Sequence, residues 1–69
     1  MMDIKTQFGN HLKQLRIKYN LTQEKLGELA NMDRSYISDI ERGIKTISIE
    51  KLKQLATAFN IELLELLKF

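Results

Sequence analysis

The sequence describes a small, weakly basic protein of 69 residues, with eleven basic and nine acidic side chains and a formal net charge of +2. Its hydrophobic share of 43% and charged share of 29% are close to the globular average, which argues against disorder. The absence of cysteine excludes disulfides and thiolate metal sites, and the single histidine cannot build an imidazole metal site alone. We therefore expect one domain, residues 1–69, that is stabilised by packing or by association.

Several functional classes are disfavoured by the same data. Apolar runs of two or three residues are far shorter than the ~20 that span a bilayer, and no charged and apolar leader opens the chain. We expect a cytoplasmic protein without a membrane segment. An enzyme would need a nucleophile, a base or a metal in a pocket, and the chain offers one histidine and no cysteine. Neither catalysis, a metal, a cofactor nor a small-molecule ligand is expected.

The first part of the chain predicts one amphipathic helix, from about Lys5 to Tyr19. Its apolar residues recur at spacings of three and four, which is typical of one buried face. This stripe consists of Ile4, Phe8, Leu12, Leu15 and Tyr19. Asn20 follows where a helix commonly ends in the left-handed conformation, which asparagine tolerates well.

A second, shorter helix is predicted to begin after Thr22, a good N-cap residue. Leu26, Leu29 and Ala30 are expected to face inward. Asn31 repeats the stop signal of Asn20, so this helix has only about two turns.

A third helix is predicted over residues 34–42. Asp33 is the expected N-cap, with its carboxylate accepting backbone N–H groups at the positive end of the helix. Ile37 and Ile40 are three residues apart and are expected to face the core, whereas the opposite face is polar. Gly43 is expected to close the helix.

Residues after 43 predict a loop, a fourth helix and a short C-terminal helix. Ser48 is the expected N-cap of the fourth helix, and Asn60 its end. The inward residues of the fourth helix are predicted to be Leu52, Leu55, Ala56 and Phe59. The C-terminal helix, about residues 62–68, holds too many apolar residues for a single stripe, so some of them are expected to face a second chain.

The second and third predicted helices form the central pattern, because two short helices joined by a turn of about four residues make a helix-turn-helix, here roughly residues 23–42. Counting from Gln23, a small residue is fifth (Gly27), a turn residue ninth (Asn31), and apolar residues fifteenth and eighteenth (Ile37 and Ile40). Gly27 is expected to let the two helices approach closely. Such an arrangement presents the outer face of the second helix of the motif, residues 34–42, to a DNA groove.

On segments 21–26 (Leu-Thr-Gln-Glu-Lys-Leu) and 36–43 (Tyr-Ile-Ser-Asp-Ile-Glu-Arg-Gly), the chain resembles the Cro and phage-repressor family of helix-turn-helix proteins, over about residues 8–67. The resemblance implies an all-α, compact five-helix fold of the lambda-repressor type and sequence-specific binding of double-stranded DNA by a transcriptional regulator. Segments 33–38 and 45–48 further resemble the controller proteins of restriction–modification systems.

The resemblance also implies roles for individual residues. By position, Gln23 binds a backbone phosphate and Arg34 reads a base, while Arg16 and Glu41 form a structural ion pair. The chain departs from the family where glycine is usual, at Asn20, Asn31 and Asn60, where alanine is usual, at Gly27, and where proline is frequent, at Ile47.

Side-chain chemistry extends the set of expected DNA contacts. The planar fork of Arg34 can donate two hydrogen bonds to guanine, and the carboxylate of Asp39 would repel phosphate or accept from cytosine. The expected base contacts are Arg34, Ser35, Tyr36, Ser38 and Asp39, and the expected phosphate contacts are Thr22, Gln23, Lys45 and Thr46. Arg34 could instead be an ordinary solvated residue, and Asp39 could simply pair with a nearby lysine or arginine.

A homodimer on a palindromic site is expected, since one helix reads too few base pairs to single out a genomic site. The expected dimer contacts are Leu63, Leu64, Leu67 and Phe69, with Ile44, Ile47 or Ile49 as further candidates. The alternative is an antitoxin-type or other protein-binding module that retains the helix-turn-helix and grips a different protein with its apolar end.

Overall fold

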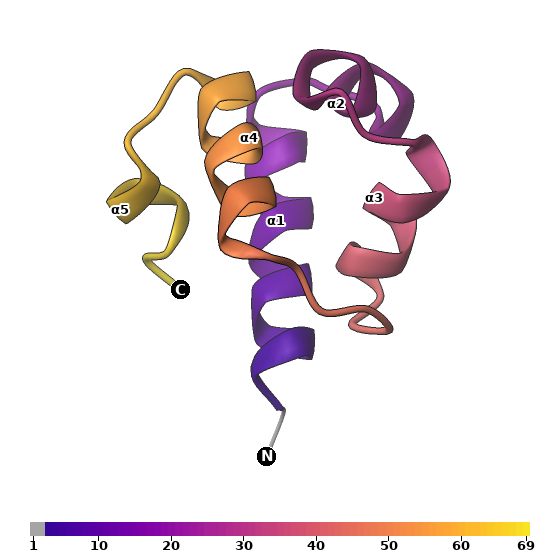
Figure 1. Cartoon of the computed structure of the whole chain (residues 1–69), viewed down its shortest axis with the longest axis vertical. Coiled ribbons are helices and arrows are strands. Elements are labelled where there is room, and N and C mark those ends of the chain that lie inside the picture. The colour runs from indigo at the N-terminus through magenta and orange to yellow at the C-terminus, as the bar shows by residue number, and fades with distance from the viewer. Residues whose placement is uncertain (1–2) are drawn as a thin grey trace.

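The computed structural model describes residues 3–69 and measures 31 × 24 × 23 Å along its principal axes. Within these residues the chain forms five helices and no strand, so the predicted all-α, five-helix fold is confirmed (Figure 1). The helices are α1 (Ile4–Lys18), α2 (Gln23–Ala30), α3 (Arg34–Glu41), α4 (Ile49–Phe59) and α5 (Leu63–Leu66). The first two residues of the expected domain lie outside the described residues.

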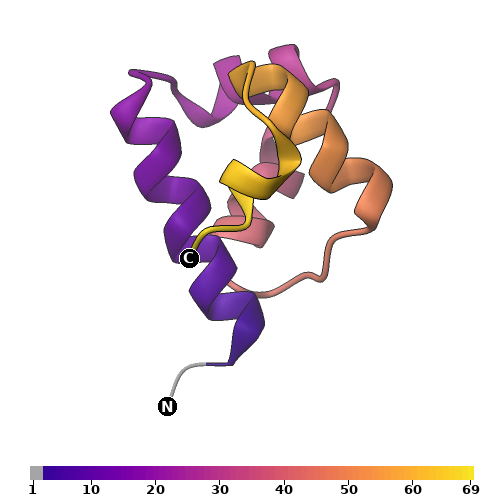
Figure 2. The same cartoon turned by 90° about the vertical axis from the view of Figure 1, so that its left-hand side faces the viewer.

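Helix α1 runs along the longest axis, with α2 and α3 on one side and α5 on the other (Figure 1). Turning the molecule by 90° brings α5 to the front and leaves α3 behind it, so these two helices lie on opposite sides (Figure 2). Helix α3 packs against α1 and α2, and α5 packs against α4. The C-terminus returns to α1, where the ring of Phe69 meets that of Phe8 edge-on at 5.6 Å.

The predicted helix starts are largely correct. Thr22 and Ser48 are N-caps whose hydroxyls accept the backbone N–H three residues on, at 3.0 and 3.2 Å. Asp3 does the same for α1, and the N–H that its carboxylate accepts lowers the pKa of Asp3 below its ordinary value. Asp33 occupies the N-cap position of α3, but the prediction that its carboxylate caps the helix is wrong. The carboxylate instead accepts from the hydroxyl of Ser35, at 2.7 Å.

The predicted helix ends follow from backbone geometry. Asn20, Asn31 and Asn60 all adopt the left-handed conformation, with φ of 58°, 58° and 59°, and Gly43 has φ of 74°. Asparagine tolerates this region because its short amide can bond locally. Three asparagines and one glycine therefore stop four helices where the pattern predicted.

Within residues 3–69, ten buried apolar residues form the core, and six of their large side chains are almost fully buried. The core residues are Phe8, Leu12, Leu26, Ala30, Ile37, Ile40, Leu55, Ala56, Phe59 and Leu66. Three residues predicted to face inward are exposed: Leu29 at 48%, Ile4 at 70% and Tyr19 at 40%, although one side of the Tyr19 ring still packs on Phe59. Leu29 lies on the flank of a two-turn helix that packs through Leu26 and Ala30, and Ile4 lies in the first turn of α1, which extends past the other helices (Figure 1).

The C-terminal helix is shorter than the predicted 62–68. Helix α5 ends at Leu66, and the N–H groups of residues 67–69 bond to carbonyls two to four residues back. Leu66 is fully buried and fixes the segment to the core. Leu64 is 69% exposed, Phe69 49% and Leu67 40%, whereas Leu63 is half-buried against the core.

Two glycines allow close backbone contact. A Cβ on Gly27 would lie 2.5 Å from the carbonyl oxygen of Met32, so the predicted close approach exists, but it is to the turn between α2 and α3 rather than to the facing helix. A Cβ on Gly9 would lie 2.5 Å from the carbonyl oxygen of Ile40 and 2.6 Å from that of Glu41. Gly9 therefore sets the closeness of α1 to α3, a role that the sequence pattern did not predict.

A buried carboxylate joins the first three helices. Glu41 is 8% exposed, and its two oxygens accept from Arg16 Nε at 2.6 Å, Arg16 Nη2 at 3.1 Å and Gln23 Nε2 at 3.1 Å. The remaining nitrogen of Arg16, Nη1, donates to the carbonyl of Leu21 at 2.8 Å. The expected pair of Arg16 and Glu41 is thus present, and Gln23 joins it, which the sequence pattern did not predict.

Replacing Gly9 by alanine is expected to destabilise the fold by about 1–3 kcal/mol, even though alanine gains ~1 kcal/mol in helix propensity. The reason is that the new methyl group collides with two backbone carbonyls of α3, which cannot rotate away. Urea unfolding followed by circular dichroism measures the change. The exposed Lys13→Ala is the control, and a Gly9→Ala variant as stable as the control would contradict the close packing of α1 on α3.

Replacing Glu41 by alanine is expected to cost about 3–5 kcal/mol, because the guanidinium of Arg16 is left buried without its partner. The control is Glu65→Ala, which breaks an exposed ion pair with Lys68 and should change stability by less than about 1 kcal/mol. The same unfolding measurement compares the two variants. Equal small effects would show that the pair of Arg16 and Glu41 contributes no more than a surface contact.

Candidate nucleic-acid interface

The outer edge of α3 is polar and open. Arg34 and Ser35 are exposed, and Ser38 is half-buried, whereas Ile37 and Ile40 on the inner edge are buried. This division follows from the helical repeat, since residues three apart share a face. The start of this edge, at Arg34 and Ser35, is open to solvent, so a groove could receive it.

One end of this edge adjoins the start of α2. Arg34 lines a shallow surface hollow together with Arg16, Thr22, Gln23 and Glu24. Two of the expected phosphate contacts already have partners here: the hydroxyl of Thr22 caps α2, and the amide of Gln23 donates to Glu41. The N-terminus of α2 lies beside these two residues. Its first backbone N–H groups have no partner within the helix, carry partial positive charge and favour an anion.

The other end of the edge adjoins the loop between α3 and α4. Asp39 pairs with Lys45 at 3.6 Å and with Arg42 at 3.9 Å. The Tyr36 hydroxyl donates to the carbonyl oxygen of Thr46 at 3.4 Å, a long contact. The ordinary alternative for Asp39, an ion pair with a nearby cation, is therefore present, although such exposed pairs contribute little to stability.

The structure adds two basic residues to this end that sequence reasoning missed. Arg42 follows Asp39 by three residues on the same helix face, so its contact could have been read from spacing. The ammonium of Lys51, on α4, lies 5.1 Å from the centre of the Tyr36 ring. No local sequence pattern connects Lys51 with Tyr36, because their contact depends on how α4 packs.

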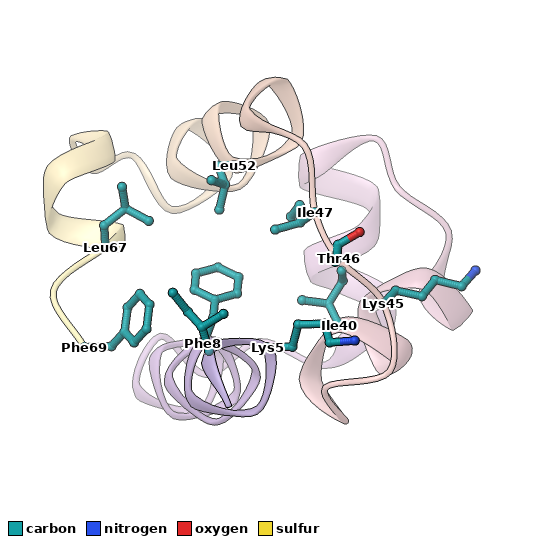
Figure 3. Close-up of a pocket in the computed structure, with 10 residues that line it drawn as sticks. Lys5, Phe8, Ile40, Lys45, Thr46, Ile47, Leu52, Leu67 and Phe69 are labelled. Carbon is teal, nitrogen blue, oxygen red and sulfur yellow. The ribbon is translucent and has the colours of Figure 1, made fainter. Parts of the chain in front are cut away.

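An apolar cavity of about 240 Å³ lies between α1, the end of α3, the α3–α4 loop, the start of α4 and the C-terminal segment (Figure 3). Phe8, Ile47, Leu52, Leu67 and Phe69 line it. Lys45 also borders the cavity, but Figure 3 shows its ammonium directed away from it. The cavity therefore offers mainly apolar contact.

The rest of the described chain gives no sign of other chemistry. Within residues 3–69, no three histidine, aspartate or glutamate side chains are grouped so that they could hold a metal ion. None of the five helices is both long and apolar enough to cross a bilayer.

Known proteins share both the sequence pattern and the fold. A helix-turn-helix family matches residues 12–66. The control protein C.MunI of a Mycoplasma species is 42% identical over 96% of this chain and 90% of its own length. The crystal structure of the restriction–modification controller protein C.AhdI from Aeromonas hydrophila superimposes with a TM-score of 0.87 at 42% identity, covering 90% of each chain.

A third similar structure includes DNA. The restriction–modification controller protein C.Esp1396I, solved as a tetramer with its natural 35 base-pair operator, superimposes with a TM-score of 0.86 at 26% identity, covering 96% of this chain and 87% of its own. The open polar edge of α3, the two-helix spacing and these matches agree. The chain belongs to the helix-turn-helix family of DNA-binding transcriptional regulators, and its relatives include restriction–modification controller proteins.

Proposed function

We propose that the protein binds a nearly palindromic DNA operator as a homodimer and reads the major groove with the helix that begins at Arg34. The observation that carries this proposal is the exposure of Arg34 and Ser35 on a helix whose opposite edge is buried and fixed by Glu41. A major groove about 12 Å wide admits a single α-helix. The rigid attachment of α3 would present its polar edge without reorienting the helix on binding.

Within the groove, side chains divide into base and phosphate contacts. Arg34 donates two hydrogen bonds to guanine, and Ser35, Tyr36, Ser38 and Asp39 are the further candidates for base contact. Because Ser35 donates to Asp33 and Asp39 pairs with Lys45, both must exchange partners to reach a base. The proposed phosphate contacts are Thr22, Gln23, Lys45 and Thr46.

The proposed dimer joins two copies through the apolar surface at the C-terminus. Leu64, Leu67 and Phe69 are exposed there, beside the apolar cavity, which a partner side chain could fill. Leu63 contributes less, because it is half-buried within its own protomer. Further exposed apolar residues, Ile44 and Ile49, lie in the α3–α4 loop and the first turn of α4.

The position of this surface suits DNA binding. Helices α3 and α5 lie on opposite sides of the protomer, so joining two copies at α5 leaves both α3 helices free (Figures 1 and 2). The tetramer that C.Esp1396I forms with its operator supports the proposal that this chain also binds DNA as an assembly of copies.

The relatives also support a biological setting. Control proteins of restriction–modification systems are similar to this chain over nearly its whole length, so we extend to it a role in controlling transcription at such a locus. DNA as the partner agrees with the cytoplasmic location that the composition predicts. No catalytic residue and no small-molecule ligand belong to this function.

Arg34→Ala is expected to weaken binding to the preferred duplex by about 1–3 kcal/mol per half-site, or roughly 5- to 150-fold for each of the two contacts, and to relax the preference at one base pair per half-site. Selection of bound duplexes from a random pool, followed by titration, measures both effects. The exposed Lys13→Ala serves as the control. An Arg34→Ala variant with the same selected sequence and affinity as the wild type would refute the assignment of Arg34 to a base.

Leu64→Glu is expected to convert a dimer at micromolar concentration into a folded monomer, because the new charge would be buried at the seam while the core of the protomer stays intact. Sedimentation velocity measures the assembly state. Leu29→Glu, which places the same charge on an exposed leucine of α2, is the matched control and should stay dimeric. A wild-type protein that is monomeric, or that needs a different protein to shift DNA, would favour the antitoxin-type alternative.

A further inference from the structure

One aromatic ring on α3 lies close to two cations. The ammonium nitrogens of Lys45 and Lys51 are 5.6 and 5.1 Å from the centre of the Tyr36 ring, within the ~6 Å at which a cation is attracted to a ring face. Tyr36 belongs to α3, Lys45 to the following loop and Lys51 to the first turns of α4. Two like charges are thereby held near each other beside the polar edge of α3.

The two lysines differ in their other partners. Lys45 is shared between the ring and the carboxylate of Asp39, 3.6 Å away, and its side chain is half-exposed. Within residues 3–69, Lys51 forms no ion pair with a carboxylate, so the ring is the group that orients its ammonium. Lys51 thus combines a fixed position with a charge that no acidic residue neutralises.

We infer that Lys51 is a further phosphate-binding residue and that the Tyr36 ring is the positioning residue that holds Lys45 and Lys51 toward the DNA backbone. This inference rests on the proposed function. It names the ligand at the end of the α3 polar edge that adjoins the α3–α4 loop: phosphate groups of one DNA strand, beside the groove that α3 enters. It adds Lys51 to the contacts expected from sequence and gives Tyr36 a role beyond base contact.

The physical reason for the arrangement is preorganisation. A free lysine side chain has many rotamers and loses that freedom when it binds, whereas a ring that already attracts the ammonium reduces the loss. The negative face of the ring also offsets part of the repulsion between the two ammonium groups. Phosphate can then replace Asp39 as the partner of Lys45 and provide the first anionic partner of Lys51.

The test compares Lys51→Gln with Lys53→Gln in DNA titrations over a range of salt. Both changes remove one positive charge from α4, but Lys53 is exposed, two residues away and on another face of the helix, without a ring contact. In the proposed homodimer, Lys51→Gln removes one phosphate-binding side chain from each protomer, so the slope of log affinity against log salt should fall by about 2. The weakening caused by Lys51→Gln should therefore be roughly tenfold larger at ~50 mM than at ~200 mM salt.

Lys51→Gln should weaken the selected duplex and a scrambled duplex by the same factor, because phosphates carry no sequence information. Lys53→Gln should leave the slope unchanged. Tyr36→Phe, which keeps the ring, should retain the wild-type slope, whereas Tyr36→Leu should lower it by about 2 or more in the dimer. Circular dichroism and the unfolding midpoint show whether each variant is folded, and Tyr36→Phe is the rescue for the weaker binding of Tyr36→Leu.

Equal salt slopes for the wild type and Lys51→Gln would overturn this inference alone, as would equal slopes for Tyr36→Phe and Tyr36→Leu. A wild-type protein that binds no duplex at any salt concentration would instead overturn the proposed function, and this inference with it. The two failures are therefore distinguishable in one set of titrations.

Discussion

The buried carboxylate of Glu41 is the interaction on which the geometry of the DNA-binding surface depends. It accepts hydrogen bonds from Arg16 on α1 and from Gln23 on α2, while it belongs to the last turn of α3. A charged pair this poorly exposed is stabilising only when its hydrogen bonds are well formed, and here both carboxylate oxygens are used. The result is a fixed relation between the N-terminus of α2 and the outer edge of α3.

Close packing of the backbone supports the same relation. Gly9 lets α1 approach the carbonyl groups of residues 40 and 41, and Gly27 lets the α2–α3 turn fold tightly onto α2. The two features leave little freedom for α3 to tilt. A rigid α3 would keep the proposed phosphate contacts of α2 and the proposed base contacts of α3 in register, which is how backbone contacts set the docking of a specific protein on DNA.

Charge on the DNA-facing side is balanced rather than uniformly positive. The net charge of the chain is only +2, and Asp39 lies among Lys45 and Arg42 on the outer side of α3. Such a carboxylate weakens attraction to arbitrary DNA, because its repulsion of phosphate is offset only where a favourable base contact exists. The Tyr36 ring gives the nearby lysines a second, uncharged partner, so the cations stay in place without full neutralisation.

Most of the fold could be predicted because it is encoded locally. Helix ends follow from three asparagines and Gly43, and the core of α1, α3 and α4 follows from the helical repeat. Errors arose where the outcome depends on neighbours in space. Leu29 is outward because α2 packs on one side only, and α5 ends at Leu66, after which the chain continues as turns back to α1. The candidate site was predictable to a similar degree, since Arg34 and Ser35 stand at the exposed start of α3, as their positions after a helix N-cap imply. The contacts of Gln23, Ser35 and Lys51 could not be foreseen, because each depends on side-chain placement or on packing between helices.

Methylation interference on the selected duplex tests the central claim most directly, namely that the polar edge of α3 enters the major groove. Methyl groups on guanine N7 lie in the major groove, and those on adenine N3 lie in the minor groove. We expect N7 methylation to block binding at two half-sites whose centres are about 10 base pairs apart. Interference confined to adenine N3, or absent from both positions, would contradict this account.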